Sequence, residues 1–234
     1  MKLSVIIPVY NERSTIEAVV RRVQAVSLVP IEKEIIAVDD GSTDGTANVL
    51  KEMSGIRRLF HERNAGKGAA LTTGFQAATG DIVLIQDADL EYDPDDYRAV
   101  IWPIAEGTSD VVMGSRFIKY KVRIFGKHRS PYISHYIGNV LITFTTNLLY
   151  GKNFTDYEGC YKAFRQAVIA TTPVEAKGFE FDNELICKLM RKGARIIEVP
   201  IRYTPRTYAR GKKITWKHGL IMLWTIITWR FRPL

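Results

Sequence analysis

The first half of the chain alternates short apolar runs with segments in which apolar residues recur at helical spacing. The apolar runs predict buried strands at residues 3–9, 34–38, 81–85 and 110–113, and residues 57–61 predict a weaker strand. The intervening segments predict helices at residues 14–26, 46–53, 66–78 and 94–105. Because units of a buried strand and a helix repeat along the chain, we expect an α/β fold with a mostly parallel sheet and helices on both faces.

The second half is less regular. It predicts helices at residues 131–150, 179–191 and 214–231, and a strand at 194–203. A membrane span needs about 20 mainly apolar residues. The last helix is uncharged over only twelve residues, from His218 to Trp229, and the helix at 131–150 contains several polar residues. We therefore expect neither helix to be a full span.

The last helix has large apolar residues at helical spacing, with Lys and Arg around them. The apolar residues are Trp216, Leu220, Leu223, Trp224, Ile227 and Phe231. This composition is typical of a helix that lies in a membrane interface. The alternative is an apolar stripe that docks on the protein's own core. We accordingly divide the chain into a catalytic domain, residues 1–213, and a C-terminal amphipathic helix, residues 214–234.

Composition and charge limit the class of protein. The chain has 234 residues, of which 46% are hydrophobic, and this suits one globular domain. Its net charge of +8 is uneven, because residues 118–130 carry five basic residues and residues 202–234 carry eight, with no acidic residue in either segment. Such segments suit an anionic membrane, a phosphorylated acceptor or nucleic acid, and a solvated surface is the alternative. Two cysteines and no signal peptide indicate a reducing, cytoplasmic setting.

Carboxylates follow two of the predicted strands. Asp87 and Asp89 come directly after the strand at 81–85, where an open α/β sheet binds its ligands. Two such carboxylates can share a hard divalent cation that keeps sites free for substrate phosphates, although a bare Asp-x-Asp is also a common polar exit from a strand. Asp39 and Asp40, after the strand at 34–38, can accept hydrogen bonds from a base or ribose. These residues favour a metal-assisted enzyme that acts on a phosphorylated substrate.

Residues 64–68, Asn-Ala-Gly-Lys-Gly, precede a predicted helix and suit an anion at its N-terminus. They do not form a P-loop, because Lys67 is followed by Gly68 rather than Ser or Thr. A nucleotidyltransferase would normally open with a glycine-rich loop, whereas this chain has Pro-Val-Tyr-Asn-Glu after its first strand. A non-enzymatic nucleic-acid binder would not need the acidic clusters, and we expect no nucleic-acid partner.

These motifs, in this order and spacing, resemble those of family 2 glycosyltransferases. Within that family the chain looks most like dolichyl-phosphate mannose synthases and related polyprenyl-phosphate glycosyltransferases. Further matching segments are residues 114–116 (Gly-Ser-Arg), 155–162 (Thr-Asp-Tyr-Glu-Gly-Cys-Tyr-Lys) and 198–201 (Glu-Val-Pro-Ile), leading to Arg206 and residues 211–213. The resemblance implies the Rossmann-like GT-A fold, a nucleotide-sugar donor and Mg²⁺ or Mn²⁺. The Gln-x-x-Arg-Trp motif of processive polysaccharide synthases is absent from the sequence.

The resemblance also implies a role for individual residues. Those implied for the nucleotide sugar are Pro8, Tyr10, Glu12, Asp39, Asp40, Lys67, Asp87, Ala88 and Asp89. Those implied for the metal are Asp87, Asp89 and Glu91, the last in place of a Gln that is frequent in relatives. Those implied for the acceptor phosphate are Arg116, Arg129, Ser134, Arg206 and Lys213. Asp156 is our candidate for orienting the sugar or the attacking group, and its alternative role is to cap a turn.

We therefore predict an inverting, metal-dependent transfer of a sugar to a polyprenyl or dolichyl phosphate. GDP-mannose is the first candidate donor and UDP-glucose the second, and a family 2 transferase with a soluble acceptor is the alternative. Many bacterial relatives continue into transmembrane helices, whereas this sequence stops at Leu234. We accordingly expect peripheral association with the cytoplasmic face of a membrane, with a membrane-anchoring partner subunit as a further possibility.

Overall fold

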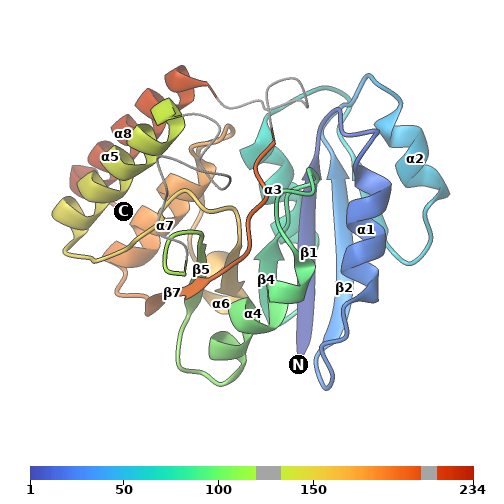
Figure 1. Ribbon diagram of the computed structural model, residues 1–234, viewed down its shortest axis with the longest axis horizontal. Helices are drawn as coiled ribbons and strands as arrows, with labels where there is room; N and C mark the ends of the chain where they lie inside the picture. The colour runs from blue at the N-terminus through green and yellow to red at the C-terminus, as the bar shows by residue number, and fades with distance from the viewer. Residues whose placement is uncertain (120–132, 207–214) are drawn as a thin grey trace.

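The computed structural model describes residues 1–119, 133–206 and 215–234, with the backbone alone for residues 133–135. Seven strands form one mixed sheet in the order β3-β2-β1-β4-β6-β5-β7 (Figure 1). The strands are β1 Lys2–Val9, β2 Glu32–Asp39, β3 Arg57–Phe60, β4 Ile82–Ile85, β5 Val111–Ser115, β6 Lys162–Arg165 and β7 Ile196–Pro200. The helices are α1 Ile16–Ala25, α2 Thr46–Glu52, α3 Lys67–Ala77, α4 Tyr97–Ala105, α5 Ile133–Tyr150, α6 Gln166–Ala170, α7 Phe181–Arg191 and α8 Trp216–Phe231.

The predicted α/β fold is confirmed, and the predicted strands and helices are present with ends that differ by a few residues. The predicted strand at 194–203 is shorter, and a 3₁₀ turn at Pro94–Asp96 opens the helix predicted at 94–105. Two elements were not predicted, β6 and α6. Strand β6 reads Lys-Ala-Phe-Arg, and four residues with a basic side chain at each end give neither an apolar run nor an alternating pattern.

Strand β6 makes the sheet mixed, but the carboxyl ends of the parallel strands still lie together at one edge. Strands β3, β2, β1 and β4 are parallel, and β6 runs antiparallel between β4 and β5. Strand β7 is parallel to β5. The strand direction reverses from β4 to β6 and again from β6 to β5, so β5 and β7 run in the same direction as β1, β2 and β4. The carboxyl ends of these five strands therefore lie at one edge of the sheet.

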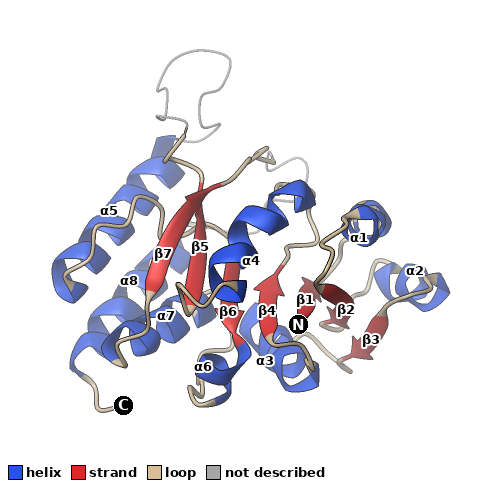
Figure 2. Ribbon diagram, turned by 90° about the horizontal axis from the view of Figure 1, so that it is seen from below, coloured by secondary structure: helices blue, strands red, loops and turns tan. Residues whose placement is uncertain are grey.

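Helices cover both faces of the sheet, and two more lie outside them. Helices α1 and α4 lie on one face, and α3 and α7 lie on the other (Figure 2). Helix α8 packs against α7, and α5 packs against α8, so these two form an outer layer at one end of the molecule (Figure 1). None of the helices in the described residues combines the length and the apolar character that a membrane crossing requires.

Helix α3 approaches the sheet closely because Gly74 faces it. A Cβ atom at this position would lie 2.3 Å from Ile6 Cγ2, in the buried core. We expect Gly74→Ala to lower the free energy of unfolding by about 1–2 kcal/mol, because over-packing costs more than the roughly 1 kcal/mol gained in helix propensity. Urea unfolding measures this change.

Gly219 in α8 is the matched control, because a Cβ atom there would meet no atom within 4 Å. Gly219→Ala should raise the free energy of unfolding by about 0.5–1 kcal/mol. Equal stabilisation by both substitutions would show that α3 does not depend on the close approach of Gly74.

Candidate active site

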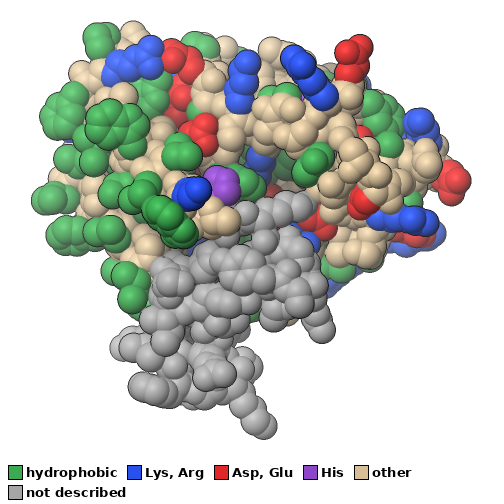
Figure 3. All heavy atoms as spheres, turned by 90° about the horizontal axis from the view of Figure 1, so that it is seen from above, with side chains coloured by type: hydrophobic (Ala, Val, Ile, Leu, Met, Phe, Trp, Pro, Cys, Tyr) green, Lys and Arg blue, Asp and Glu red, His purple; other side chains and the backbone are tan. Residues whose placement is uncertain are grey.

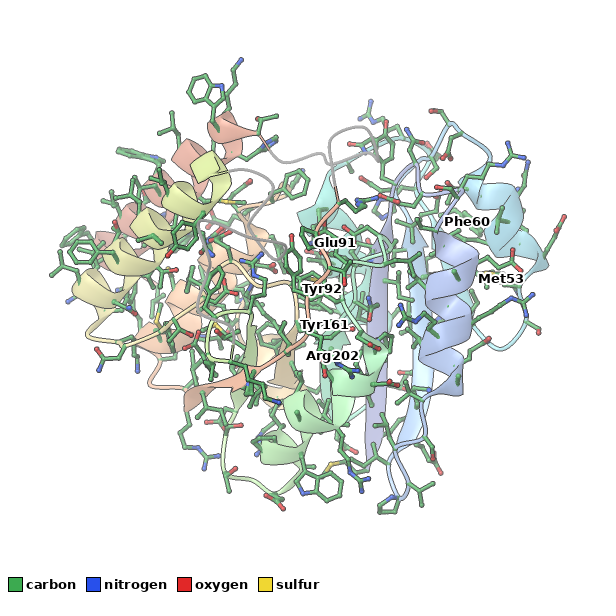
Figure 4. All side chains as sticks on the ribbon, viewed as in Figure 1. Met53, Phe60, Glu91, Tyr92, Tyr161 and Arg202 are labelled. Atoms are coloured by element: carbon green, nitrogen blue, oxygen red, sulfur yellow. The ribbon has the colours of Figure 1, made fainter. Side chains whose placement is uncertain are left out.

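Side chains predicted for the site gather at the carboxyl edge of the sheet. The strands β1, β2, β4 and β5 lead to Glu12, to Asp39 and Asp40, to Asp87 and Asp89, and to Arg116, respectively. Pro8 and Tyr10 lie at the end of β1, and buried Ala88 separates the two aspartates that follow β4. Figure 4 shows Glu91 and Tyr92 near the centre of the molecule, between its two halves.

Asp87 forms an ion pair with the lysine at the start of α3. Lys67 Nζ lies 2.8 Å from Asp87 Oδ1, and both side chains are about one-fifth exposed. Burial raises the pKa of Asp87, but the charges of Lys67 and Lys162 outweigh it and hold the pKa below its usual value. Asp87 is therefore an ionised carboxylate, as a metal ligand must be.

Asp89 has a different environment. Its Oδ2 atom lies 3.0 Å from Arg206 Nη2, and its Oδ1 atom accepts a hydrogen bond from the backbone N–H of Glu91. Burial and the negative charges of Asp87 and Glu91 raise the pKa of Asp89 to about 7, although Arg206 acts in the opposite direction. Among the described residues, the carboxylates of Glu12, Asp87, Asp89 and Glu91 thus lie around two cations, Lys67 and Arg206, which is an excess of negative charge.

This excess of carboxylate charge suits a divalent cation. Within the described residues, no three His, Cys, Asp or Glu side chains form a ready-made metal cage. Mg²⁺ does not need one, because it is usually bound by one or two carboxylates together with water and substrate phosphates. Asp87 and Asp89 meet that requirement. Glu91 stays a predicted ligand, since its Oε1 atom accepts the backbone N–H of Arg206.

The two aspartates at the end of β2, Asp39 and Asp40, differ in their hydrogen-bond partners. Asp40 is 2% exposed, and its carboxylate binds His61 Nδ1 at 2.7 Å and accepts hydrogen bonds from the N–H groups of Ala65 and Gly66. Asp39 is equally buried, but its Oδ1 atom has no hydrogen-bond partner among the described residues. Asp40 therefore shapes the loop before α3, whereas Asp39 keeps an oxygen without a partner among the described residues. The contact of both residues with the nucleoside stays a prediction.

The same contacts correct our interpretation of residues 64–68. We predicted that these residues suit an anion at the helix N-terminus. The anion that the N–H groups of Ala65 and Gly66 bind is the protein's own Asp40 carboxylate. The N–H of Ala69 donates to the Lys177 carbonyl oxygen, and Lys67 is paired with Asp87. The segment thus positions Lys67 and leaves few donors for a ligand.

The Arg116 guanidinium is paired with the carboxylate of Asp156. The Arg116 guanidinium donates from Nε and Nη2 to the two Asp156 oxygens at 2.7 and 2.8 Å, and its backbone N–H donates to Oδ2. The Arg116 guanidinium also lies 4.9 Å from the centre of the Tyr203 ring. Asp156 is fully buried and positions Arg116 in this structure. Its role in orienting the sugar or the attacking group stays a prediction.

Two positioning residues were not predicted. Asn139, on α5, donates from Nδ2 to Asp156 Oδ1 at 3.0 Å. Glu198, on β7, accepts hydrogen bonds from the backbone N–H groups of Thr155 and Asp156. Asn139 belongs to a polar stripe on a mainly apolar helix, and Glu198 lies in a segment that carried the family resemblance. These two features of the sequence could have indicated Asn139 and Glu198 as positioning residues.

The remaining predicted residues are placed only in part. Arg206 reaches Glu12 and Asp89 from the segment after β7. Ser134 lies in the first turn of α5, and its side chain falls outside the description. Arg129 and Lys213 lie outside the described residues. Their assignment to the acceptor phosphate stays a prediction.

The assignment of Asp156 as a positioning residue predicts a large effect on stability. Asp156→Asn should lower the free energy of unfolding by about 3 kcal/mol, because it leaves the mostly buried Arg116 guanidinium without its counter-ion. Denaturant unfolding measures this effect. Asp95→Asn is the control, because Asp95 is largely exposed and lies 3.8 Å from Arg202. Unchanged stability in Asp156→Asn, together with lost activity, would return Asp156 to direct contact with substrate.

Comparison with solved structures supports the fold. Glucosyl-3-phosphoglycerate synthase from Mycobacterium tuberculosis, solved with Mn²⁺, UDP and phosphoglyceric acid, superposes with a TM-score of 0.74 over 100% of this chain and 80% of that chain. The sequence identity is 20%. A structure of the same enzyme with Mg²⁺ and UDP gives a TM-score of 0.71. The GT-A fold implied by the sequence is thus confirmed.

Comparison of sequences gives the family. UDP-N-acetylglucosamine–dolichyl-phosphate N-acetylglucosaminyltransferase of Methanococcus voltae is 31% identical over 89% of this chain and 89% of its own length. Dolichol-phosphate mannosyltransferase of Pyrococcus furiosus and undecaprenyl-phosphate 4-deoxy-4-formamido-L-arabinose transferase of Proteus mirabilis are each 30% identical. The chain spans 58% and 62% of the lengths of these two proteins. The model of glycosyl transferase family 2 matches residues 4–172, and the chain belongs to this family.

Proposed function

We propose that this enzyme transfers a sugar from a nucleotide sugar to a polyprenyl phosphate. The names of the three sequence relatives support this acceptor, because dolichyl, dolichol and undecaprenyl phosphates are all polyprenyl phosphates. Their sugars differ, so they do not select one donor. GDP-mannose is our first candidate and UDP-glucose the second. The observation that carries the proposal is helix α5, whose inner side supports the Asp156–Arg116 pair and whose outer side is an exposed apolar face.

Helix α5 turns its polar side inward and its apolar side outward. Asn139, Thr143 and Thr146 are buried, and Asn139 and Thr143 hold the segment around Asp156. The outward-facing residues are 47–71% exposed, and they are Ile137, Val140, Leu141, Phe144 and Leu148. Water does not favour such an arrangement, since a helix of a soluble domain normally buries its apolar side. A lipid surface does favour it.

Helix α8 extends this surface. We had left open whether its apolar stripe faces a membrane or the core. Trp216, Leu220, Trp224 and Phe231 are 58–73% exposed, so these residues do not dock on the core. The helix packs inward through a second apolar face, formed by Met222, Ile226 and Trp229, which was not predicted.

We name the exposed apolar residues of α5 and α8 the two-helix surface. In Figure 3 hydrophobic side chains gather at the left of the molecule, where these two helices lie. Lys217 and Arg230 are exposed on α8 and suit the anionic head groups of lipids. A contiguous exposed apolar patch of this kind marks an interaction site. We propose that it is a membrane surface, because the long acceptor chain stays in the bilayer.

Asp39, Asp87 and Asp89 support binding of the donor. The unpaired Asp39 Oδ1 atom suits a donor group of the base or ribose, such as an N–H or a hydroxyl. Asp87 and Asp89 would hold the Mg²⁺ or Mn²⁺ ion, which neutralises the diphosphate and stabilises its departure. Lys67 fixes the position of Asp87 from the side of α3.

The arginines support binding of the acceptor. A polyprenyl phosphate is an anion at neutral pH and needs little help from a base, so the main barrier is to bring two anions together. Arg116 and Arg206 suit this task, since guanidinium groups bind phosphate oxygens in pairs. The acceptor oxygen would form a bond to the anomeric carbon as the bond to the diphosphate breaks. In-line attack inverts the configuration at that carbon, and positioning and electrostatic stabilisation carry the reaction.

A transfer assay tests the proposed reaction. Protein, Mn²⁺ or Mg²⁺, a short-chain polyprenyl phosphate and radiolabelled GDP-mannose or UDP-glucose should yield label that partitions into organic solvent. Asp89→Asn should lower turnover by roughly 100-fold, because it weakens the charge that holds the cation against the leaving diphosphate. Asp95→Asn, an exposed acidic residue, should leave turnover unchanged. Label that stays aqueous with every donor, or full turnover in Asp89→Asn, would contradict the proposal.

A vesicle assay tests the two-helix surface. We expect the triple variant Phe144→Ser, Leu148→Ser and Trp224→Ser to lose at least tenfold in co-sedimentation with anionic vesicles, because each apolar side chain inserted is worth up to about 1.5–3 kcal/mol. Val29→Ser is the control, since Val29 is 76% exposed in the turn between α1 and β2, outside the two-helix surface.

Equal sedimentation of the triple variant and the parent protein would contradict a role for this surface. Binding to native membranes but not to protein-free vesicles would replace the lipid surface by a partner subunit. Thermal unfolding checks that the triple variant folds, which we expect because none of the three side chains is buried.

A further inference from the structure

Arg206 lies among three carboxylates that come from two different parts of the chain. Its Nη1 and Nη2 atoms lie 3.0–3.2 Å from the Glu12 carboxylate, in the segment after β1. Its Nη2 atom lies 3.0 Å from Asp89 Oδ2, and its Nε atom lies 4.0 Å from Glu91 Oε1. The Arg206 side chain is 14% exposed. One guanidinium thus serves as the counter-ion of three acidic side chains.

The backbone presents Arg206 at this place. The N–H of Arg206 donates to Glu91 Oε1 at 2.7 Å, and the N–H of Thr204 donates to the Glu91 carbonyl oxygen at 2.8 Å. Tyr203 pairs with Tyr92 in an isolated antiparallel bridge. The segment that carries Arg206 is therefore fixed alongside the residues that follow Asp89.

Arg206 and a divalent cation would compete for the carboxylate of Asp89. The guanidinium contacts Asp89 Oδ2, an oxygen of the carboxylate that would bind the cation. Asp89 Oδ1 already accepts the N–H of Glu91. A guanidinium and a divalent cation on one carboxylate oxygen repel each other, and this repulsion offsets part of what each gains. Binding of the cation is therefore more favourable when Arg206 leaves Asp89.

After it leaves Asp89, Arg206 would keep Glu12 as a carboxylate partner and its Nε atom as a hydrogen-bond donor. Glu12 is outside the predicted metal ligands, and Thr15 Oγ1 fixes its carboxylate with a 2.8 Å hydrogen bond. Glu12 can hold the guanidinium after Asp89 is released. The Arg206 Nε atom is buried and has no hydrogen-bond partner among the described residues. A phosphate oxygen of an acceptor would supply that partner.

We propose that Arg206 is the resident counter-ion of Asp89 in the donor-free enzyme, and that loading of the donor with its divalent cation releases Arg206 to bind the acceptor phosphate. This inference rests on the proposed function for the identity of the two substrates. It makes binding ordered, with the nucleotide sugar before the polyprenyl phosphate. The order has a chemical advantage, because the acceptor phosphate would find its arginine only when a sugar is in place.

The first test measures Mn²⁺ binding to the full chain without nucleotide, by electron paramagnetic resonance. Arg206→Gln should bind Mn²⁺ about tenfold more tightly than the parent protein, because the competing cation is gone. Arg202→Gln is the matched control. Arg202 lies on the same segment but contacts Asp93, Asp95 and Asp96, and its Mn²⁺ affinity should stay within about twofold of the parent. Figure 4 shows Arg202 apart from Glu91.

Equal or weaker Mn²⁺ binding by Arg206→Gln would overturn the inference. This measurement needs no transfer reaction, so it stands even if the acceptor of the proposed function is wrong. Conversely, organic-soluble product in the transfer assay together with unchanged Mn²⁺ affinity would keep the proposed function and remove the role of Arg206 as a competitor.

The second test uses the parent protein and does not depend on a variant folding. Affinity for a short-chain polyprenyl phosphate is measured with and without Mn²⁺ and GDP or UDP. We expect at least fivefold tighter binding in the presence of Mn²⁺ and the nucleotide that binds, and by reciprocity the same factor in the other direction. Equal affinity under both conditions would overturn the ordered release.

Discussion

Repulsion between carboxylates at one edge of the sheet is the constraint on which the site depends. Parallel strands bring Glu12, Asp39, Asp87 and Asp89 to the same edge, where burial strengthens every charge. The protein manages this charge with two cations of its own, Lys67 on Asp87 and Arg206 on Asp89. Burial, together with the negative charges of Asp87 and Glu91, raises the pKa of Asp89. A site of this kind gains stability when a divalent cation and its diphosphate enter together.

A second polar network joins this edge to the outer helices. Asp156 fixes Arg116 through two oxygens, and Asn139 of α5 fixes Asp156 in turn. The opposite side of α5 is apolar and exposed. Helix α5 therefore supports the Arg116–Asp156 pair with its inner side and exposes an apolar surface on its outer side. This arrangement would place the acceptor phosphate at the site while its chain stays in the bilayer.

The sequence predicted the sheet and its strand-end carboxylates because apolar runs and the aspartates that follow them are local patterns. It did not predict what those carboxylates contact. Asp40 binds His61, and Asp156 binds Arg116 forty positions away, and no local pattern specifies such pairs. Helix α8 shows a further limit, since it is apolar on two faces and spacing does not tell which one docks. Strand β6 was too short to stand out, yet it sets the direction of β5.

Thermal unfolding with nucleotides tests the central claim most directly, which is that the crowded carboxylates form a site for a divalent cation with a nucleoside diphosphate. A ligand at 100 times its Kd adds about 2.7 kcal/mol, which corresponds to a shift of roughly 5–10 °C in Tm for a domain of this size. We predict that GDP or UDP with Mn²⁺ produces such a shift and that the same nucleotide with a chelator gives little or none. A shift that is equal in chelator, or no shift with either nucleotide, would contradict the account.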